Sequence, residues 1–364
     1  MPVPVPVDAP YLHAFGASAG RFPAAEFFAQ VRVIVTSENP NPPRRRSLKK
    51  RMARWFRRHW PARGQLVPSA PDFLQRFASG GVVDCVAQGF RFAEGPLWIE
   101  EDGCLLFSDI HDDRMRRVWD DGRVEIFRQP SAHANGLTRD LDGRLIVCEH
   151  QTRRLTRTEP DGAQKILADA YDGKRLNSPN DVVVRSDGAI YFTDPPCALT
   201  AADQELYFQG VFRLSPDGGE LRVVAPELVK PNGLAFSLDE SLLYVDDSAQ
   251  RNLWVFDVAP DGDFGRGRVF HDMDGPGLGS PDGMKLDVDG TIFCAGPGGT
   301  WVFTPEGRHA GTIVTPEKPT NCAFGGADLR TLYITTPGSV YRVRTERPGV
   351  APWRRPSTPP AGSV

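Results

Sequence analysis

The feature that most constrains the fold is a phrase that recurs six times between residues 101 and 335. Each copy is an acidic turn, Asp-Gly in four of them, followed by a short apolar strand. Asp-Gly pairs supply the positive φ that tight hairpins require, so each copy predicts a turn that leads into a strand. The copies are EDGCLLFSD, LDGRLIVCE, SDGAIYFTD, LDESLLYVD, VDGTIFCAG and ADLRTLYIT.

A second short strand precedes each copy, and successive starts of these strands are 39 to 52 residues apart. A third strand follows, as in MRRVWDDGRVEIF and LWVFDVAPDGDF. Periods of about 40–50 residues built from three or four strands are typical of β-propeller blades. The sequence therefore predicts an all-β fold, a six-bladed β-propeller. An open β-sandwich is the alternative, and six copies in register argue against it. The preceding strands start at Glu94, Asn135, Asn180, Asn232, Asp282 and Asn321.

The two ends of the repeat region predict how the ring closes. The last copy ends at 339–345, one strand short of a full blade, and the strand at 82–89 precedes the first copy. Pairing of these two segments would close the ring and remove the open edges that invite aggregation. We therefore expect the propeller over 81–346, a short, largely irregular N-terminal extension over 1–80, and a C-terminal tail over 347–364.

The net charge of -3 averages two regions of opposite sign. Residues 44–63 hold ten Lys or Arg and no acidic residue, which leaves -13 for the remainder. This basic arm is either a solvated extension or an anchor for a membrane or nucleic acid; a twin-arginine export signal lacks its apolar region. The modest total charge argues against a dedicated nucleic-acid binder, so we expect no nucleic-acid partner. No stretch approaches the ~20 apolar residues of a transmembrane segment.

The six cysteines are well separated and form no CxxC pair, so they do not predict a cysteine zinc site. Four of them lie in or beside apolar runs, which predicts buried, reduced thiols and a cytoplasmic location. These four are Cys104, Cys148, Cys294 and Cys322.

The six residues that start the first strands all carry a side-chain oxygen. In a propeller the first strand of each blade lines the central channel, so these residues should converge at one face. Turn chemistry explains one or two Asn or Asp residues, but it does not explain Glu94 in the same register. Two carboxylates with several amides suit one hard divalent cation. Calcium is the first choice, and magnesium, manganese or zinc are the alternatives.

Four phrases in the same order resemble the regucalcin/gluconolactonase family of six-bladed propellers. The resemblance covers about 81–346 and leaves the basic arm unexplained. The phrases are EGPLW (94–98), GKRLNSPNDVVV with YFTDPP (173–196), PNGLAFS (231–237) and SPDGMKLD (280–287).

The family pattern implies roles for single residues. Asn135 would lie at the channel mouth beside the substrate, and His133 is a further substrate-binding candidate. Animal members have an Arg where Ser178 stands here, so that contact does not carry over; Lys174 or Arg175 is the candidate replacement. One divalent metal would take an oxygen from each of Glu94, Asn180, Asn232 and Asp282.

The resemblance implies a metal-dependent hydrolase that opens a sugar lactone such as gluconolactone. A divalent ion polarises the carbonyl of this cyclic ester, and an activated water attacks it. Asp282 is the candidate base, and a metal-bound hydroxide without a separate base is an equally coherent mechanism. His133, His150 and Asp194 are further candidates for proton transfer.

Two other functions stay open at this point. One is a hydrolase of other esters or phosphotriesters on the same propeller, and the other is a non-enzymatic calcium-binding propeller. The sequence does not indicate which lactone is the substrate or how many chains associate.

Overall fold

The computed structural model describes residues 63–78, 81–197 and 199–351. The basic arm lies outside the described residues except for Arg63, and so does the predicted tail beyond Ala351. The described residues form an all-β unit with only two short 3-10 helices, η1 (Phe73–Arg76) and η2 (Ile110–Asp112). Within these ranges no helix has the length and apolar character needed to cross a membrane.

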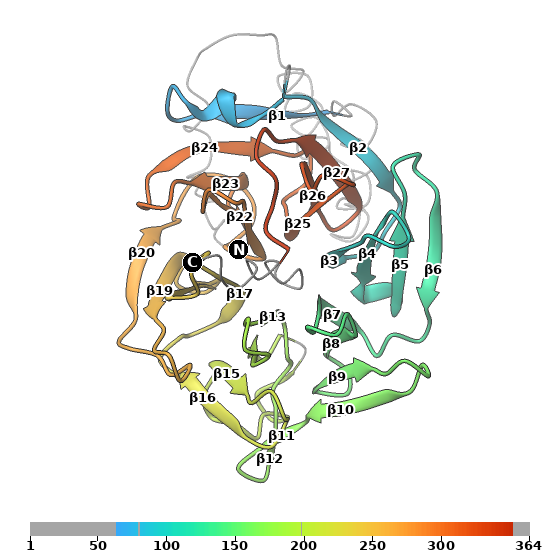
Figure 1. Ribbon diagram of the computed structural model, residues 1–364, viewed down its shortest axis with the longest axis vertical. Coiled ribbons are helices and arrows are strands. Elements are labelled where there is room, and N and C mark those ends of the chain that lie inside the picture. The colour runs from blue at the N-terminus through green and yellow to red at the C-terminus, as the bar shows by residue number, and fades with distance from the viewer. Residues whose placement is uncertain (1–62, 79–80, 198, 352–364) are drawn as a thin grey trace, which may run out of the picture. The chain divides into compact units, whose positions relative to one another are not determined.

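Most strands belong to four separate four-stranded antiparallel sheets arranged around a central axis (Figure 1). The first sheet is β3 (Ala93–Ile99), β4 (Cys104–Asp109), β5 (Arg114–Val118) and β6 (Val124–Arg128). The second is β7 (Ala134–Arg139), β8 (Leu145–Glu149), β9 (Arg154–Thr158) and β10 (Gln164–Ala168). The third is β13 (Val182–Val184), β14 (Ile190–Thr193), β15 (Val211–Leu214) and β16 (Leu221–Ala225). The fourth is β17 (Pro231–Phe236), β18 (Leu242–Asp247), β19 (Asn252–Asp257) and β20 (Arg268–Asp272).

The remaining long strands form one nine-stranded sheet, with the order β21-β22-β23-β24-β1-β2-β27-β26-β25. The prediction of six separate blades is therefore not confirmed by the hydrogen bonds, which form four separate four-stranded sheets. The other two groups of four strands are joined into one sheet by β1. The strands are β1 (Arg63–Pro68), β2 (Val83–Gln88), β21 (Met284–Leu286), β22 (Ile292–Gly296), β23 (Gly299–Phe303), β24 (His309–Val314), β25 (Asn321–Gly325), β26 (Thr331–Thr335) and β27 (Ser339–Arg344). A two-stranded hairpin, β11 (Ala170–Tyr171) and β12 (Lys174–Arg175), stands apart.

The predicted pairing of the chain ends is confirmed, because β2 pairs antiparallel with β27. Strand β1, within the segment where the sequence predicts an irregular extension, pairs with β24 on one side and with β2 on the other. The turn η1 that follows brings Phe73 into a core cluster, where it is fully buried. We call β1, η1 and the flanking strands β24 and β2 the seam.

The innermost strands contact one another in a closed circle. Strand β3 contacts β7, β7 contacts β13, β13 contacts β17, β17 contacts β21, β21 contacts β25, and β25 contacts β3. Glycines allow this approach: a Cβ at Gly95 would lie 2.0 Å from the Asn135 carbonyl oxygen, and one at Gly233 would lie 2.6 Å from that of Asp282. Since each of these glycines directly follows a strand-start residue, the backbone of the circle positions the polar side chains.

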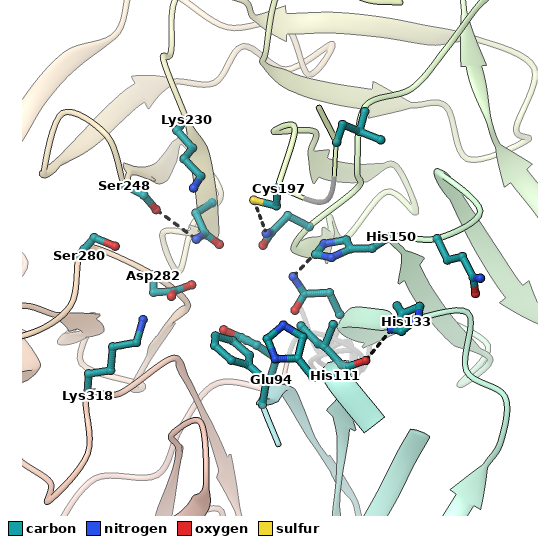
Figure 2. Close-up of a pocket in the computed structure, with 17 residues that line it drawn as sticks. Glu94, His111, His133, His150, Cys197, Lys230, Ser248, Ser280, Asp282 and Lys318 are labelled. Atoms are coloured by element: carbon teal, nitrogen blue, oxygen red, sulfur yellow. Dashed lines mark hydrogen bonds between the residues drawn. The ribbon is translucent and has the colours of Figure 1, made fainter. Parts of the chain in front are cut away.

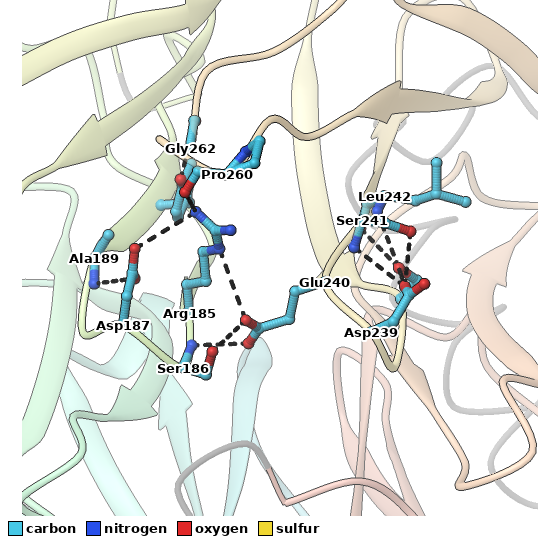
Figure 3. Close-up of polar contacts among 12 residues, drawn as sticks. Arg185, Ser186, Asp187, Ala189, Asp239, Glu240, Ser241, Leu242, Pro260 and Gly262 are labelled. Atoms are coloured by element: carbon cyan, nitrogen blue, oxygen red, sulfur yellow. Dashed lines mark hydrogen bonds and ion pairs between the residues drawn. The ribbon is translucent and has the colours of Figure 1, made fainter.

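The acidic turns of the six copies adopt the predicted left-handed conformation. In three of them the Asp side chain closes the turn. Oδ1 of Asp187 accepts from the Ala189 N–H and Oδ1 of Asp239 accepts from the Ser241 N–H (Figure 3), and Oδ1 of Asp328 accepts from the Arg330 N–H. Neighbouring sheets also meet here, where the Ser186 N–H donates to Glu240. The third turn residue has φ between 55° and 91° in every copy, at Gly103, Gly143, Gly188, Glu240, Gly290 and Leu329.

Candidate active site

Five of the six strand-start residues line one pocket at the centre of the ring (Figure 2). Its volume is about 630 Å³, within the roughly 300–1,000 Å³ of small-molecule sites. Four of the five are more than nine-tenths buried, and Asp282 is partly exposed. The structure thus brings together Glu94, Asn135, Asn180, Asn232 and Asp282.

The three asparagines hold their amide groups in the same way. Nδ2 of Asn135 lies 3.1 Å from Nε2 of His150, and Nδ2 of Asn232 donates to the Ser248 hydroxyl over 3.1 Å. Nδ2 of Asn180 contacts the Cys197 sulfur at 3.6 Å. Because each amide nitrogen is engaged by a neighbouring side chain, the amide oxygen is the atom left for a ligand.

The two carboxylates of the pocket form no ion pair with a described residue, and the charges of Lys285 and Lys318 act on Glu94 and Asp282 without direct contact. Both hydrogen bonds to Glu94, from the Gly95 N–H and from Asn321 Nδ2, go to Oε2, which leaves Oε1 for a ligand. Burial raises the pKa of both Glu94 and Asp282; the charge of Asp181 adds to the rise at Glu94, and that of Glu94 adds to the rise at Asp282. A bound cation would reverse both shifts, since it favours the ionised carboxylates.

Asn321, the sixth strand-start residue, does not line the pocket. Its Nδ2 donates to Glu94 and its Oδ1 accepts from the Cys322 N–H, so both ends of the amide are already used. Its hydrogen bond to Glu94 makes it a support for that carboxylate rather than a ligand-binding group.

Two other candidates lie away from the pocket. Arg175 is exposed on β12, where its backbone N–H donates to Glu205 and its side chain donates to the Thr152 carbonyl. Asp194 is fully buried and accepts from the Asn177 N–H, and burial raises its pKa to about 7. Neither is among the residues that line the pocket, so neither contacts a ligand bound there.

Histidines occupy one side of the pocket. His133 and His150 line it, together with His111, which the sequence did not single out. The ring of His133 is fixed by a 2.7 Å contact between its Nδ1 and the Ile110 carbonyl. Burial lowers the pKa of His150 to about 4, so this side chain is neutral at pH 7.

Lysines occupy the other side, and sequence reasoning missed them. Lys230 and Lys318 both line the pocket, near Ser248 and Ser280 (Figure 2). A signal was available: each lysine belongs to a Lys-Pro pair just before an innermost strand, in KPN at 230–232 and KPTN at 318–321.

Comparison with known proteins places the chain. The family model for the SMP-30/Gluconolactonase/LRE-like region matches residues 92–338. The chain belongs to the SMP-30/gluconolactonase/LRE-like family. It is 38% identical over 295 residues to a gluconolactonase of Zymomonas mobilis, which covers 72% of this chain and 81% of that protein.

Solved structures of the SMP-30/gluconolactonase/LRE-like family share the architecture. A gluconolactonase from Xanthomonas campestris superposes with a TM-score of 0.69 at 34% identity, over 79% of this chain and 99% of its own. A calcium-binding regucalcin from Agrobacterium tumefaciens gives 0.61 at 21% identity, over 72% and 92%, and this likeness shows the fold alone.

The donor set decides which ion the pocket fits. Among the described residues no three His, Cys, Asp or Glu side chains cluster as a metal site. Two carboxylates with three available amide oxygens form an all-oxygen set, which suits a hard cation such as Ca²⁺ better than zinc. The residues present therefore fit a hard divalent cation.

Proposed function

We propose that this chain is a lactonase that hydrolyses a sugar lactone with the help of one divalent cation. The observation that carries the proposal is the convergence of Glu94, Asp282 and the asparagine amide oxygens on a single pocket in a gluconolactonase-family fold. The 38% identity to a gluconolactonase supports a sugar lactone as the substrate class.

Glu94, Asn180, Asn232 and Asp282 would hold the cation, with Ca²⁺ as the first choice. When bound, it would polarise the lactone carbonyl and stabilise negative charge on that oxygen. The 3.2 Å hydrogen bond from Asn321 Nδ2 holds the Glu94 carboxylate in place. The carboxyl of Asp282 is the candidate to take the proton of the attacking water.

Asn135 and His133 would orient the lactone. The contact between Asn135 and neutral His150 fixes the amide, so that its oxygen can accept from a sugar hydroxyl. Arg175 has no part in this proposal, because it lies outside the pocket.

The same proposal completes the blade count. We infer that the nine-stranded sheet corresponds to two blades, β21 to β24 and β25, β26, β27 with β2, joined by β1. The six innermost strands that contact in a circle support a six-bladed propeller. All six cysteines are free, and the four predicted to be buried are buried, which supports a reducing, cytoplasmic location.

A lactone panel followed by pH drop, with metal content measured on the same sample, tests the proposal. We expect turnover of gluconolactone that is lost with a chelator and restored by Ca²⁺ or another divalent ion. Chelator-insensitive turnover would contradict the metal, and hydrolysis of esters or phosphotriesters without any lactone would favour the alternative hydrolase. Metal binding without turnover of any substrate would favour a non-enzymatic calcium-binding propeller.

A further inference from the structure

The two pocket lysines have no task in the reaction described so far. Among the described residues neither ammonium group forms an ion pair, although the positive charge of Lys318 acts on the carboxylate of Asp282. Lys318 is held by an aromatic face, with its Nζ 5.7 Å from the centre of the Phe92 ring. Lys230 is anchored by its backbone, whose N–H donates to Asp247. The Lys318 ammonium is therefore positioned by its ring contact, and neither lysine is neutralised by direct contact with a described carboxylate.

The net charge of the pocket indicates what the two lysines could bind. Its formally charged lining residues are two carboxylates, Glu94 and Asp282, and two lysines. If a divalent cation is held by the carboxylates, as in the proposed function on which this inference rests, the lysines remain as an excess of two positive charges. An excess of this kind in a partly enclosed pocket attracts an anion.

The arrangement also provides a place for that anion. Figure 2 shows both lysines on the side of the pocket away from His133 and His150, with their ammonium ends pointing inward and with the hydroxyls of Ser248 and Ser280 nearby. The Ser248 hydroxyl already donates its one proton to the Pro281 carbonyl, so the donors left for an anion are the two ammonium groups and the Ser280 hydroxyl. Ammonium and hydroxyl donors on one wall suit a carboxylate or phosphate.

We propose that Lys230 and Lys318 form an anion subsite, so that the preferred substrate is a sugar lactone bearing a carboxylate or phosphate group away from the ring carbonyl. The lactone carbonyl then lies near the oxygens of Glu94, Asp282 and the asparagine amides, and the acidic substituent lies near Lys230 and Lys318. A pocket of about 630 Å³ has room for both parts of such a ligand.

The test compares three lactones as substrates of the full chain: neutral glucono-1,5-lactone, its 6-phosphate, and glucaro-1,4-lactone. The wild type should show a higher kcat/KM for at least one anionic lactone than for the neutral one. The better of the two anionic lactones shows whether the subsite prefers a phosphate or a carboxylate. Lys230→Met and Lys318→Met should each lower the anionic-to-neutral ratio of kcat/KM by roughly tenfold. Lys230→Arg and Lys318→Arg should retain most of the preference, and Lys165→Met, on the exposed strand β10, should leave the ratio as in the wild type.

An unchanged ratio in both Met variants would overturn the subsite while leaving the lactonase intact. If no lactone is hydrolysed, calorimetric binding of 6-phosphogluconate, glucarate and gluconate to the Ca²⁺-loaded protein decides instead. If the wild type binds 6-phosphogluconate or glucarate more tightly than gluconate, and the double Met variant loses this preference, the subsite is supported. Equal binding of all three by the wild type overturns it, and that result is separate from failure of the proposed activity.

Discussion

At the pocket, five strand-start residues place polar groups around a cavity, whereas at the seam Phe73 and Val83 are enclosed by apolar neighbours. Glu94 and Asp282 are held with raised pKa values and without an ion pair to a described residue, while the seam strand β1 pairs with β2 through its first two residues and with β24 through the other four. The difference indicates that the pocket keeps its groups ready for a ligand at a cost in stability, and that the seam contributes stability without touching the ligand.

The largest effect should follow from Asp282→Asn. This change removes both a proposed metal ligand and the proposed proton acceptor, so kcat/KM should fall about 10⁴-fold. Without added metal, the melting temperature should stay the same or rise, because the repulsion between the Asp282 and Glu94 carboxylates has been removed. If the Asp282→Asn variant loses stability but keeps its activity, Asp282 contributes to stability rather than to the reaction, and the contrast between pocket and seam is wrong.

The seam is tested by Phe73→Ala. The side chain is fully buried among β2, β24 and their neighbours, so the free energy of unfolding should fall by about 3–5 kcal/mol. Activity per folded molecule should be unchanged at a temperature where the variant is folded. Denaturant titration alongside the lactone assay measures both, and a change in KM or kcat of the folded variant would show that the regions are coupled.

Gly233→Ala tests whether the backbone of the circle sets the pocket. The new Cβ would lie 2.6 Å from the Asp282 carbonyl oxygen and 2.7 Å from Asp246 Oδ2, so the strands must separate. We expect a loss of about 3 kcal/mol in unfolding free energy, together with weaker metal binding measured by calorimetry. Gly265→Ala is the matched control, because its nearest contact would be 3.6 Å away and neither property should change.

His150 should make the pocket sensitive to acid. Burial lowers its pKa to about 4 in the folded protein, against 6.5 for the unfolded chain. Between these values the unfolded state binds more protons, so the stability contributed by neutral His150 is present at pH 7 and is lost as the pH falls toward 4. The loss between pH 7 and pH 5 should be about 2 kcal/mol. Denaturant titrations of the wild type and of His150→Gln at both pH values measure the contribution of His150. An equal loss of unfolding free energy in the two proteins would contradict the prediction.

Much of this architecture could be predicted because the information is local. Asp-Gly turns specify their own φ values, and Glu94 stands out because it keeps the register of the asparagines. Strand β1 could not be found in this way, since RGQLVP carries no turn signal and its partners are near it only in space. The position of Arg175 outside the pocket lining could not be predicted for a similar reason, because a separate hairpin holds it against Glu205 and Thr152.

The pairing of β2 with β27 has a consequence for the order of events during synthesis. Strand β2 is made first among the strands of its group, yet its partner β27 is the last strand that the structure describes. Each of the four separate sheets can assemble as soon as its own consecutive strands have left the ribosome, but the circle cannot be completed until β27 has been synthesised. Until then β2 presents an unpaired edge, which makes a nascent or truncated chain the form most exposed to aggregation.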